Sequence, residues 1–279
     1  MDVRLVAEPQ EFLDAAGALL LADEARHNVI LGLANTLVEH PDHYPERRLW
    51  VVEDAGAVVG AAVRTPPYNL AVARPAAGGA LDALAEAIDE PLPGVSGAVP
   101  EVDRFAAAWS ERTGRVPRVD VRMALYRLER VAPVTAPGAP RAATHDDLDL
   151  LCRWWRAFLE EVSHDPPASD ADVEAAVRLR LDAEGWGIGL WEDGGEPVAF
   201  AAFGNPTPNG ARVGPVYTPP GRRRNGYAGA LVAHVSQALL DSGRRFCFLY
   251  ADAGNPSANG IYRRIGYEQV ADSANVAFE

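Results

Sequence analysis

The sequence predicts a mixed α/β (α+β) fold built from two tandem domains. Strands and helices are interspersed along the chain, and several strands are adjacent in hairpins, which is typical of mixed sheets covered by helices. The order of these elements is similar on both sides of a Pro/Ala-rich segment. A length of 279 residues suits one large or two modest domains, at about 100–200 residues each. Two copies of one fold are therefore the simplest interpretation.

The expected boundary is the segment 131–141, which holds three Pro, three Ala and one Gly. Proline removes a backbone donor and biases the preceding residue toward extended conformations, so this segment fits neither a helix nor a central strand. We expect a first domain over residues 1–130, a linker over 131–141 and a second domain over 142–279.

In the first domain, the turn Asp54-Ala55-Gly56 between two apolar runs predicts a hairpin. An N-terminal helical stretch precedes it. Elsewhere, helices are expected where apolar residues recur at helical spacing, and strands where apolar residues form short runs. The expected elements are strands 49–53, 57–63, 69–73, 95–99 and 119–128, and helices 80–88 and 102–112.

In the second domain, the first helix begins at the cap-like Thr144 and carries an apolar stripe that includes Leu148, Leu151 and Trp155. Such a stripe is typical of a helix that packs one face on a sheet. Ser169 opens a second helix, and a polar turn at 192–195 joins two strands of a hairpin. The expected elements are helices 144–161, 169–181, 228–239 and 257–265, and strands 186–191, 197–203, 211–217, 246–251 and 269–278.

The charge balance argues against polyanions as general partners. The chain has 26 basic and 39 acidic residues and a formal net charge of −13. Neither nucleic acid nor an anionic membrane surface is attracted to such a protein, whereas cationic or amine-bearing partners are. Every basic residue is Arg, and the absence of Lys excludes Schiff-base chemistry and a lysine nucleophile.

Cys152 and Cys247 are the only cysteines, too few for a disulfide framework or a thiolate zinc site. Both lie in apolar runs, so we expect buried free thiols in a reducing cytoplasm. No metal site is predicted, because the closely spaced His40 and His43 fit a surface turn better. The N-terminal residues lack a signal-peptide pattern, and no run of 18 apolar residues predicts a membrane helix.

The segment 213–229 combines a strand, a tight turn and a helix start. The first turn of a helix presents unpartnered backbone N–H groups and partial positive charge, which suit a phosphate. Gly226, Ala228 and Gly229 keep side chains out of the way, and three consecutive Arg residues precede them. Pro215 cannot donate to a strand ladder, which predicts a bulge or a splayed edge. The alternative interpretation is an ordinary Gly-rich turn with an exposed Arg run.

Two patterns together resemble the GCN5-related N-acetyltransferase (GNAT) superfamily. Arg223-x-x-Gly226-x-Ala228 after a strand is similar to its acyl-CoA pyrophosphate loop. Asn255-x-x-Ala258-x-x-Ile261-Tyr262-x-x-x-Gly266-Tyr267, about 30 residues later, is similar to its next block. The resemblance covers roughly residues 141–279. It implies twisted, mostly antiparallel sheets flanked by helices, and acetyl-CoA as the cofactor, with coenzyme A as a product.

The resemblance also implies a role for each matching residue. Backbone groups on the strand before the loop would pair with the pantetheine arm, and loop amides would cradle the pyrophosphate. Tyr262 would protonate the departing thiolate, with a core position as its alternative interpretation. Tyr267 is expected to pack against the sheet. The expected cofactor-binding residues are Val216, Tyr217, Thr218, Arg223, Arg224, Asn225, Gly226, Tyr227, Ala228, Gly229, Asn255 and Asn259.

The implied reaction is direct attack of a neutral primary amine, on a small molecule or a peptide, at the acetyl carbonyl. It requires a route for the ammonium proton. Many relatives place a Glu on the strand before the loop, but residues 211–218 contain no acid. Glu160, Glu161, His164 and Asp165 are candidates for substrate contact, with a solvated helix end as the alternative, and the base stays unassigned.

The first half lacks these patterns. Residues 74–79 contain no Arg-x-x-Gly-x-Ala, and Ser110 aligns with Tyr262. We therefore expect a degenerate copy of the fold, with an unrelated domain as the alternative. An acyl-CoA-binding sensor or scaffold without turnover is the alternative function, and Tyr262 favours the enzyme. The acceptor, the acyl chain and the oligomeric state, monomer or homodimer, stay open.

Overall fold

The computed structural model describes residues 1–162 and 168–279. The chain forms two compact units. Unit 1 comprises residues 1–125, 252–254 and 270–279, and unit 2 comprises residues 126–251 and 255–269. The expected division was consecutive, whereas residues 270–279 belong to unit 1. The reason is that β12 (Glu268–Phe278) pairs with β5 (Gly94–Ala98) through residues 273–277. Hydrogen bonding, and not position in the chain, decides which sheet a strand completes.

The strands of unit 1 follow the order β1-β2-β3-β4-β5-β12. Neighbouring strands run antiparallel except β4 and β5, which are parallel. The bounds of the strands not yet given are β1 (Asp2–Val6), β2 (Arg48–Asp54), β3 (Ala57–Arg64) and β4 (Leu70–Val72). A further strand, β6 (Pro117–Leu128), contributes residues 117–125 to unit 1 and 126–128 to unit 2. The sequence predicted all of these strands except β1.

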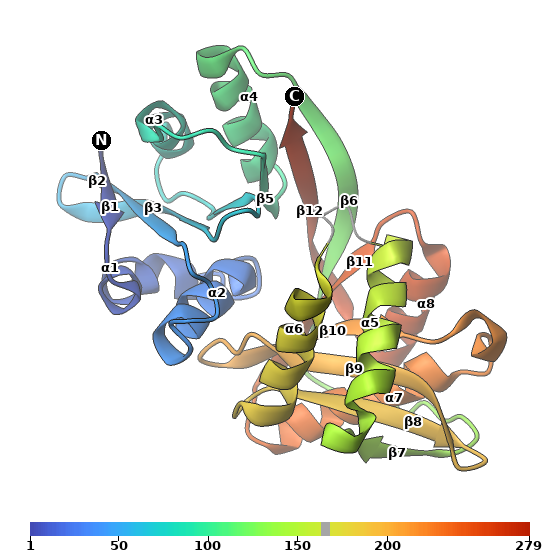
Figure 1. The fold of residues 1–279 in the computed structure, drawn as a ribbon. Coiled ribbons are helices and arrows are strands. Elements are labelled where there is room, and N and C mark those ends of the chain that lie inside the picture. The colour runs from blue at the N-terminus through green and yellow to red at the C-terminus, as the bar shows by residue number, and fades with distance from the viewer. Residues whose placement is uncertain (163–167) are drawn as a thin grey trace. The chain divides into compact units, whose positions relative to one another are not determined.

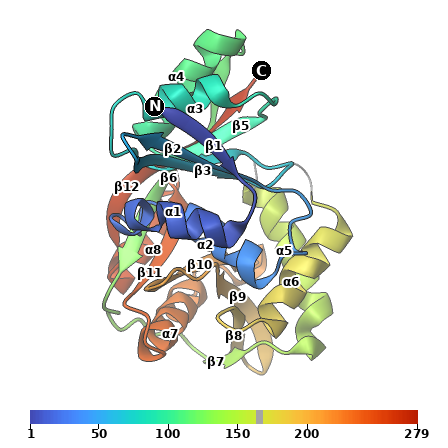
Figure 2. The same ribbon diagram turned by 90° about the vertical axis from the view of Figure 1, so that its left-hand side faces the viewer.

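Helices cover both faces of the unit 1 sheet (Figure 2). Strand β2 shows why: Leu49 and Val51 pack with α1 (Pro9–Leu21) and α2 (Asn28–Glu39), whereas Trp50 and Val52 pack with α3 (Ala80–Ala87) and α4 (Glu101–Thr113). Successive side chains of a strand point to opposite faces. A run of apolar residues without polar interruption is therefore expected for a strand buried on both sides.

The strands of unit 2 follow the order β11-β10-β9-β8-β7, antiparallel except for the parallel pair β10–β11. Their bounds are β7 (Ala139–Ala142), β8 (Gly187–Asp193), β9 (Glu196–Gly204), β10 (Gly210–Tyr217) and β11 (Phe246–Asp252). Strand β7 comes from the end of the expected linker and lies at the edge of the sheet, where Pro140 is tolerated. Mixed sheets flanked by helices confirm the predicted fold class.

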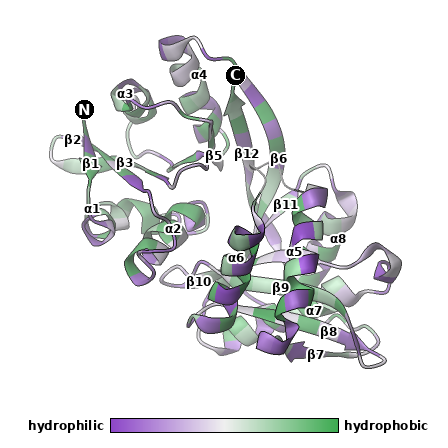
Figure 3. Ribbon diagram, in the orientation of Figure 1, coloured by the Kyte–Doolittle hydropathy of each residue, from purple (hydrophilic) through white to green (hydrophobic). Residues whose placement is uncertain are grey.

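Helices α5 (Leu148–Val162) and α6 (Asp170–Asp182) cover one face of this sheet, with α7 (Tyr227–Asp241) and α8 (Pro256–Ile265) behind it (Figure 1). Trp155 of α5 stacks on Phe200 of β9 with ring centroids 5.8 Å apart. In Figure 3, α5 and α6 carry hydrophilic residues interspersed with hydrophobic ones, as the predicted one-sided packing requires.

Two further expectations concern single residues and helix composition. Cys152 and Cys247 are free and buried as predicted, and burial raises the pKa of the Cys247 thiol to about 12. Within residues 1–162 and 168–279, no helix has the length and apolar character needed to cross a membrane.

Candidate active site

Strand β10 separates from β11 partway along its length. The parallel pairing covers only Gly210 to Arg212, opposite Phe246 to Phe248. Beyond it, β10 continues beside β9, and the register shifts between Val213 and Val216. This irregularity confirms the bulge predicted from Pro215. The separation leaves the β11-facing edge of residues 213–217 outside the β10–β11 ladder, so these backbone groups can pair with a ligand.

The turn after β10 leads into α7 through Gly226. Its φ of +84° is left-handed, a conformation that glycine adopts without a Cβ penalty. Arg224, at φ +67°, is also left-handed. Gly226 caps α7 without a side-chain hydrogen bond, so the first-turn N–H groups of Tyr227, Ala228 and Gly229 stay available for an anion.

Helix α8 begins at a side-chain cap. Asn255 Oδ1 accepts a hydrogen bond from the N–H of Ala258, with 3.0 Å between the two atoms. Tyr262 follows two turns later, and its ring centroid lies 6.1 Å from that of Tyr267. Burial raises the pKa of the Tyr262 phenol to about 12. A phenol with such a pKa keeps its proton at neutral pH.

These three segments surround a pocket of about 660 Å³, a size typical of ligand sites. Eleven of the thirteen predicted site residues line it, including Tyr262 and Asn255. The lining residues predicted from the sequence are Val216, Tyr217, Thr218, Arg223, Arg224, Gly226, Tyr227, Ala228, Gly229, Asn255 and Tyr262. The sequence patterns therefore identified one connected site.

The pocket fits the arm and the phosphates of an acyl-CoA. In the part of the chain that the structure describes, the Thr218 hydroxyl oxygen is buried and has no hydrogen-bond partner. Because a buried polar atom without a partner is costly, a ligand with amide groups would satisfy it. Gly229 avoids crowding in the lining of the pocket, since a Cβ there would lie 3.3 Å from Ile261 Cγ2. The unpaired edge of β10, the unsatisfied Thr218 hydroxyl and the open start of α7 together suit an acyl-CoA.

Arg223 is held by its neighbours. Its Nη2 donates to both Glu161 carboxylate oxygens, at 2.6 and 2.7 Å, and its Nε donates to the Thr218 carbonyl at 2.8 Å. The guanidinium carbon also lies 5.8 Å from the Tyr217 ring centroid. Arg223 therefore ties the loop to α5, and Arg222 and Arg224 also line the pocket.

Three predicted residues use their side chains elsewhere. The Asn225 amide donates to the carbonyls of Arg222 and Arg223 and so shapes the turn. The Tyr227 hydroxyl donates to Asp193, which leaves only its backbone at the pocket. Asn259 is buried behind Asn255 and does not line the pocket. Its spacing of three residues from Tyr262 predicted a shared helix face but did not predict which way the Asn259 side chain turns.

Of the candidate acids, Glu161 lines the pocket and Glu160 does not. His164 and Asp165 lie outside the described residues. Within the described ranges, no group of three or more His, Cys, Asp and Glu side chains is arranged to hold a metal ion.

The expected linker forms part of the pocket, which the sequence did not indicate. Val134 lines the pocket and Ala136 Cβ would lie 3.5 Å from a Cβ at Gly226. The segment is held by two hydrogen bonds: the Ala132 N–H donates to the Ile265 carbonyl, and Trp191 Nε1 donates to the Pro137 carbonyl, each at 2.7 Å. A Pro/Ala-rich composition gives no signal for such contacts. Other lining residues beyond the predicted site residues are Phe158, Arg222, Ser257, Ala258, Ile261 and Arg264.

Residues 148–267 match the family model described as acetyltransferase (GNAT) family. No curated protein matches the chain in sequence. Among solved structures, a Drosophila melanogaster protein has a TM-score of 0.70 at 13% identity, covering 99% of this chain and 98% of that one. A GNAT-family acetyltransferase from Colwellia psychrerythraea has a TM-score of 0.62 at 11% identity, covering 100% of this chain and 99% of that one. A tandem GNAT protein from the clavulanic acid biosynthesis pathway has a TM-score of 0.59 at 14% identity, covering 100% of this chain and 98% of that one.

These TM-scores and coverages show a shared fold along the whole chain, as expected for two tandem copies. The family match contains every residue that lines the pocket except Val134. Residues 148–267 therefore form a domain of the acetyltransferase (GNAT) family.

Proposed function

We propose that the protein is an acetyl-CoA-dependent N-acetyltransferase that acetylates a primary amine of a small molecule or a peptide. The observation that carries the proposal is the 660 Å³ pocket, which is lined by the separated strand, the open start of α7 and Tyr262. In this proposal unit 2 is the catalytic copy and unit 1 is the degenerate one.

The chain's own residues would hold the cofactor in three places. Backbone groups of Val216 and Thr218 would pair with the pantetheine amides as an added strand does. The N–H groups at the start of α7 would bind the pyrophosphate. Asn255 would contact the arm from the opposite wall. When bound, acetyl-CoA supplies a thioester that a neutral amine can attack.

Tyr262 would act as the proton donor. Its phenol stays protonated at neutral pH, because burial raises its pKa to about 12, and it faces the pocket. A protonated phenol at this position can donate its proton to the departing thiolate, whereas a protein that only binds acyl-CoA requires no acid there. Tyr262 thus favours an enzyme over an acyl-CoA sensor or scaffold.

Strand β10 contains no carboxylate side chain that could deprotonate the amine. Glu161 is the acid that lines the pocket, but both of its carboxylate oxygens accept hydrogen bonds from Arg223 Nη2. We propose that the overall acidic surface attracts the cationic acceptor, and that the proton leaves through solvent.

The test is a thiol-release assay with acetyl-CoA and a panel of primary amines, with mass spectrometry of the acetylated product. The enzyme should release coenzyme A only in the presence of a suitable amine. A sensor would bind acetyl-CoA in calorimetry without release by any amine. A protein that does not bind acetyl-CoA would contradict both functions.

A further inference from the structure

A buried hydrogen-bonded series lies behind the pocket wall. The Tyr126 hydroxyl, on β6, donates to Asn259 Oδ1, with 2.9 Å between the oxygens. Asn259 Nδ2 then donates to the backbone carbonyl of Asn255 at 2.8 Å. Tyr126 is completely buried and Asn259 is 6% exposed. The series therefore joins Tyr126, a strand residue outside the family match, to Asn255, which lines the pocket.

The series holds the backbone of Asn255 in place. The Asn255 carbonyl accepts a second hydrogen bond from the Asn259 N–H at 3.1 Å, and the Asn255 side chain caps α8. The last torsion of an Asn side chain has broad energy wells, so two fixed partners are needed to set the Asn259 amide. Tyr126 supplies one of them.

The Tyr126 ring has a separate packing role. Its centroid lies 6.3 Å from that of Tyr262, and the Arg263 guanidinium carbon lies 6.0 Å from the same ring. Replacing Tyr126 by Phe would keep the ring and remove only the hydroxyl. The Asn259 Oδ1 would then be buried without this donor, which favours rotation of the amide and loosens its bond to Asn255.

We propose that Tyr126 is a positioning residue for the cofactor site, which acts through Asn259 on Asn255. The inference rests on the proposed acetyl-CoA site, because Asn255 is expected to contact the cofactor. It gives the N-terminal strand β6 a part in the site of unit 2, through the three residues that β6 contributes to that unit.

The experiment compares Tyr126→Phe with Tyr267→Phe. Both tyrosines are buried, both rings lie about 6 Å from the Tyr262 ring, and the Tyr267 hydroxyl hydrogen-bonds to Ser236 on α7 at 2.9 Å. Calorimetric titration with acetyl-CoA should show a Kd raised about threefold to tenfold in Tyr126→Phe, the equivalent of one hydrogen bond. The Kd of Tyr267→Phe should stay within twofold of wild type.

Asn259→Ala shows whether the effect passes through the Asn259 amide, because it removes both the acceptor of the Tyr126 hydroxyl and the donor to the Asn255 carbonyl. Because coupled residues are not additive, adding Tyr126→Phe to Asn259→Ala should leave the Kd of the single Asn259 variant unchanged. A full threefold to tenfold loss in that background, a wild-type Kd in Tyr126→Phe alone, or an equal loss in Tyr267→Phe would overturn the inference.

Amide hydrogen exchange without ligand separates this inference from the proposed function. The N–H groups of Ala258 and Asn259 should exchange faster in Tyr126→Phe than in Tyr267→Phe or wild type. Unchanged exchange would overturn the positioning role, whether or not acetyl-CoA binds. If wild-type protein does not bind acetyl-CoA, the proposed function fails, and the role of Tyr126 toward that cofactor fails with it.

Discussion

The two units differ most where a parallel pair of strands leads into a helix. In unit 2, β10 runs on for five residues past its last partner on β11, and a pocket opens there. In unit 1, β4 has only three residues, two of which pair with β5. The same strand order thus produces an open strand edge in one unit and a short strand followed directly by a loop in the other.

The helix starts are more alike than the sequence suggested. Gly79 caps α3 with a φ of +83°, nearly the value of +84° at Gly226 before α7. The absence of the full loop pattern from residues 74–79 therefore does not mean that the small capping residue is missing. A glycine cap alone is compatible with both a cofactor loop and an ordinary helix start.

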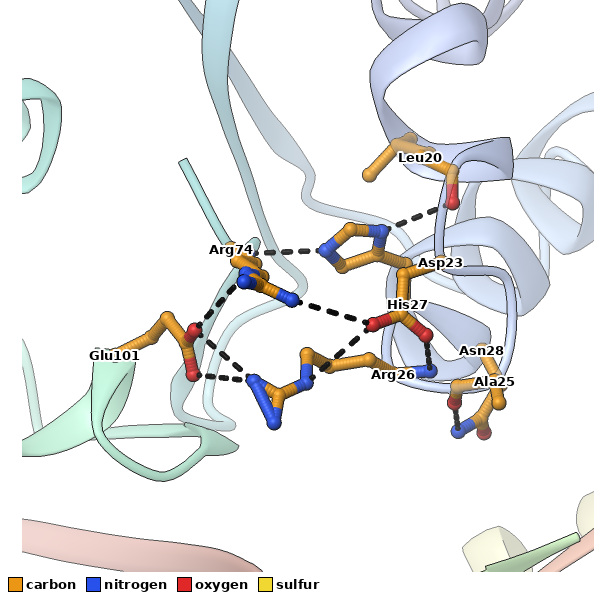
Figure 4. A network of polar contacts seen from close by, with 8 residues as sticks. All are labelled: Leu20, Asp23, Ala25, Arg26, His27, Asn28, Arg74 and Glu101. Carbon is orange, nitrogen blue, oxygen red and sulfur yellow. Dashed lines mark hydrogen bonds and ion pairs between the residues drawn. The ribbon is translucent and has the colours of Figure 1, made fainter. Parts of the chain in front are cut away.

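In unit 1 a network of polar side chains includes Arg74, which closely follows β4 (Figure 4). The Arg74 N–H donates to His27 Nε2 at 3.0 Å, and the other ring nitrogen of His27 lies 2.9 Å from the Leu20 carbonyl oxygen. Arg26 Nη1 donates to both carboxylate oxygens of Glu101, at 3.1 and 3.2 Å. Burial lowers the pKa of His27, in keeping with a neutral ring. In unit 1, therefore, a side chain of the protein itself takes up a backbone N–H group that follows β4.

The largest expected effect is the loss of acetyl-CoA binding in Gly226→Asp. The substitution places a Cβ at a left-handed φ and a negative charge beside the open N–H groups of α7. Ligand at a hundred times Kd stabilises the folded state by about 2.7 kcal/mol, so acetyl-CoA should raise the Tm of wild type and not of this variant. Gly79→Asp is the matched control: it introduces the same backbone strain at a left-handed φ, and acetyl-CoA should still raise the Tm of this variant. An equal rise in Gly226→Asp would refute the cofactor loop.

Tyr262→Phe should lower kcat about tenfold to a hundredfold while the Kd for acetyl-CoA stays within a few-fold. General acids typically contribute about 10²–10⁴, but a thiol of pKa about 8.5, if it resembles Cys, needs less assistance. Because burial raises the pKa of Tyr262 to about 12, the phenol stays protonated up to about pH 10. The variant should therefore lower the whole pH–rate profile below that pH without shifting its limbs. Wild-type kcat with a confirmed amine would remove Tyr262 from the mechanism.

Glu101→Gln should reduce the stability of unit 1 by about 2 kcal/mol, because the mostly buried Arg26 then keeps only its 3.6 Å ion pair with Asp23. Hydrogen exchange should show faster exchange in α4 and in residues 23–27. Exchange in α7 and α8, and the Kd for acetyl-CoA, should stay as in wild type. Faster exchange confined to α7 and α8 would contradict the assignment of this cluster to unit 1.

The smallest expected effect concerns stoichiometry. Calorimetry should give one acetyl-CoA per chain, both in wild type and in Glu101→Gln. The variant removes the negative charge beside Arg26 and Arg74, but β4 stays too short to offer an unpaired strand edge. Two molecules per wild-type chain would show that unit 1 is also a cofactor site, whereas two only in the variant would show that Glu101 alone prevents binding.

Local sequence patterns were sufficient for most elements and for the core of the site. The strand–turn–helix at 213–229 and the capped helix at Asn255 depend on neighbouring residues: a bulge at Pro215, a left-handed Gly226 and an Asn cap. Backbone preferences of this kind act within a few residues, so a sequence displays them. That the two segments line one pocket was expected from the resemblance to the GNAT superfamily and not from local preferences.

The tertiary structure alone decided what depends on distant partners. Composition marked Val134 as part of the linker, but its place at the pocket follows from the hydrogen bonds of its neighbours: Ala132 donates to Ile265, and Pro137 accepts from Trp191. The last strand joins unit 1 because β5 offers it a free edge, and Tyr126 meets Asn259 across 133 positions of sequence. The sequence by itself determined the elements and the loop, because short-range stereochemistry specifies them, and its resemblance to the GNAT superfamily supplied Tyr262 as the catalytic candidate. Which side chains close unit 1 and which support unit 2 depends on long-range packing, and no local pattern encodes it.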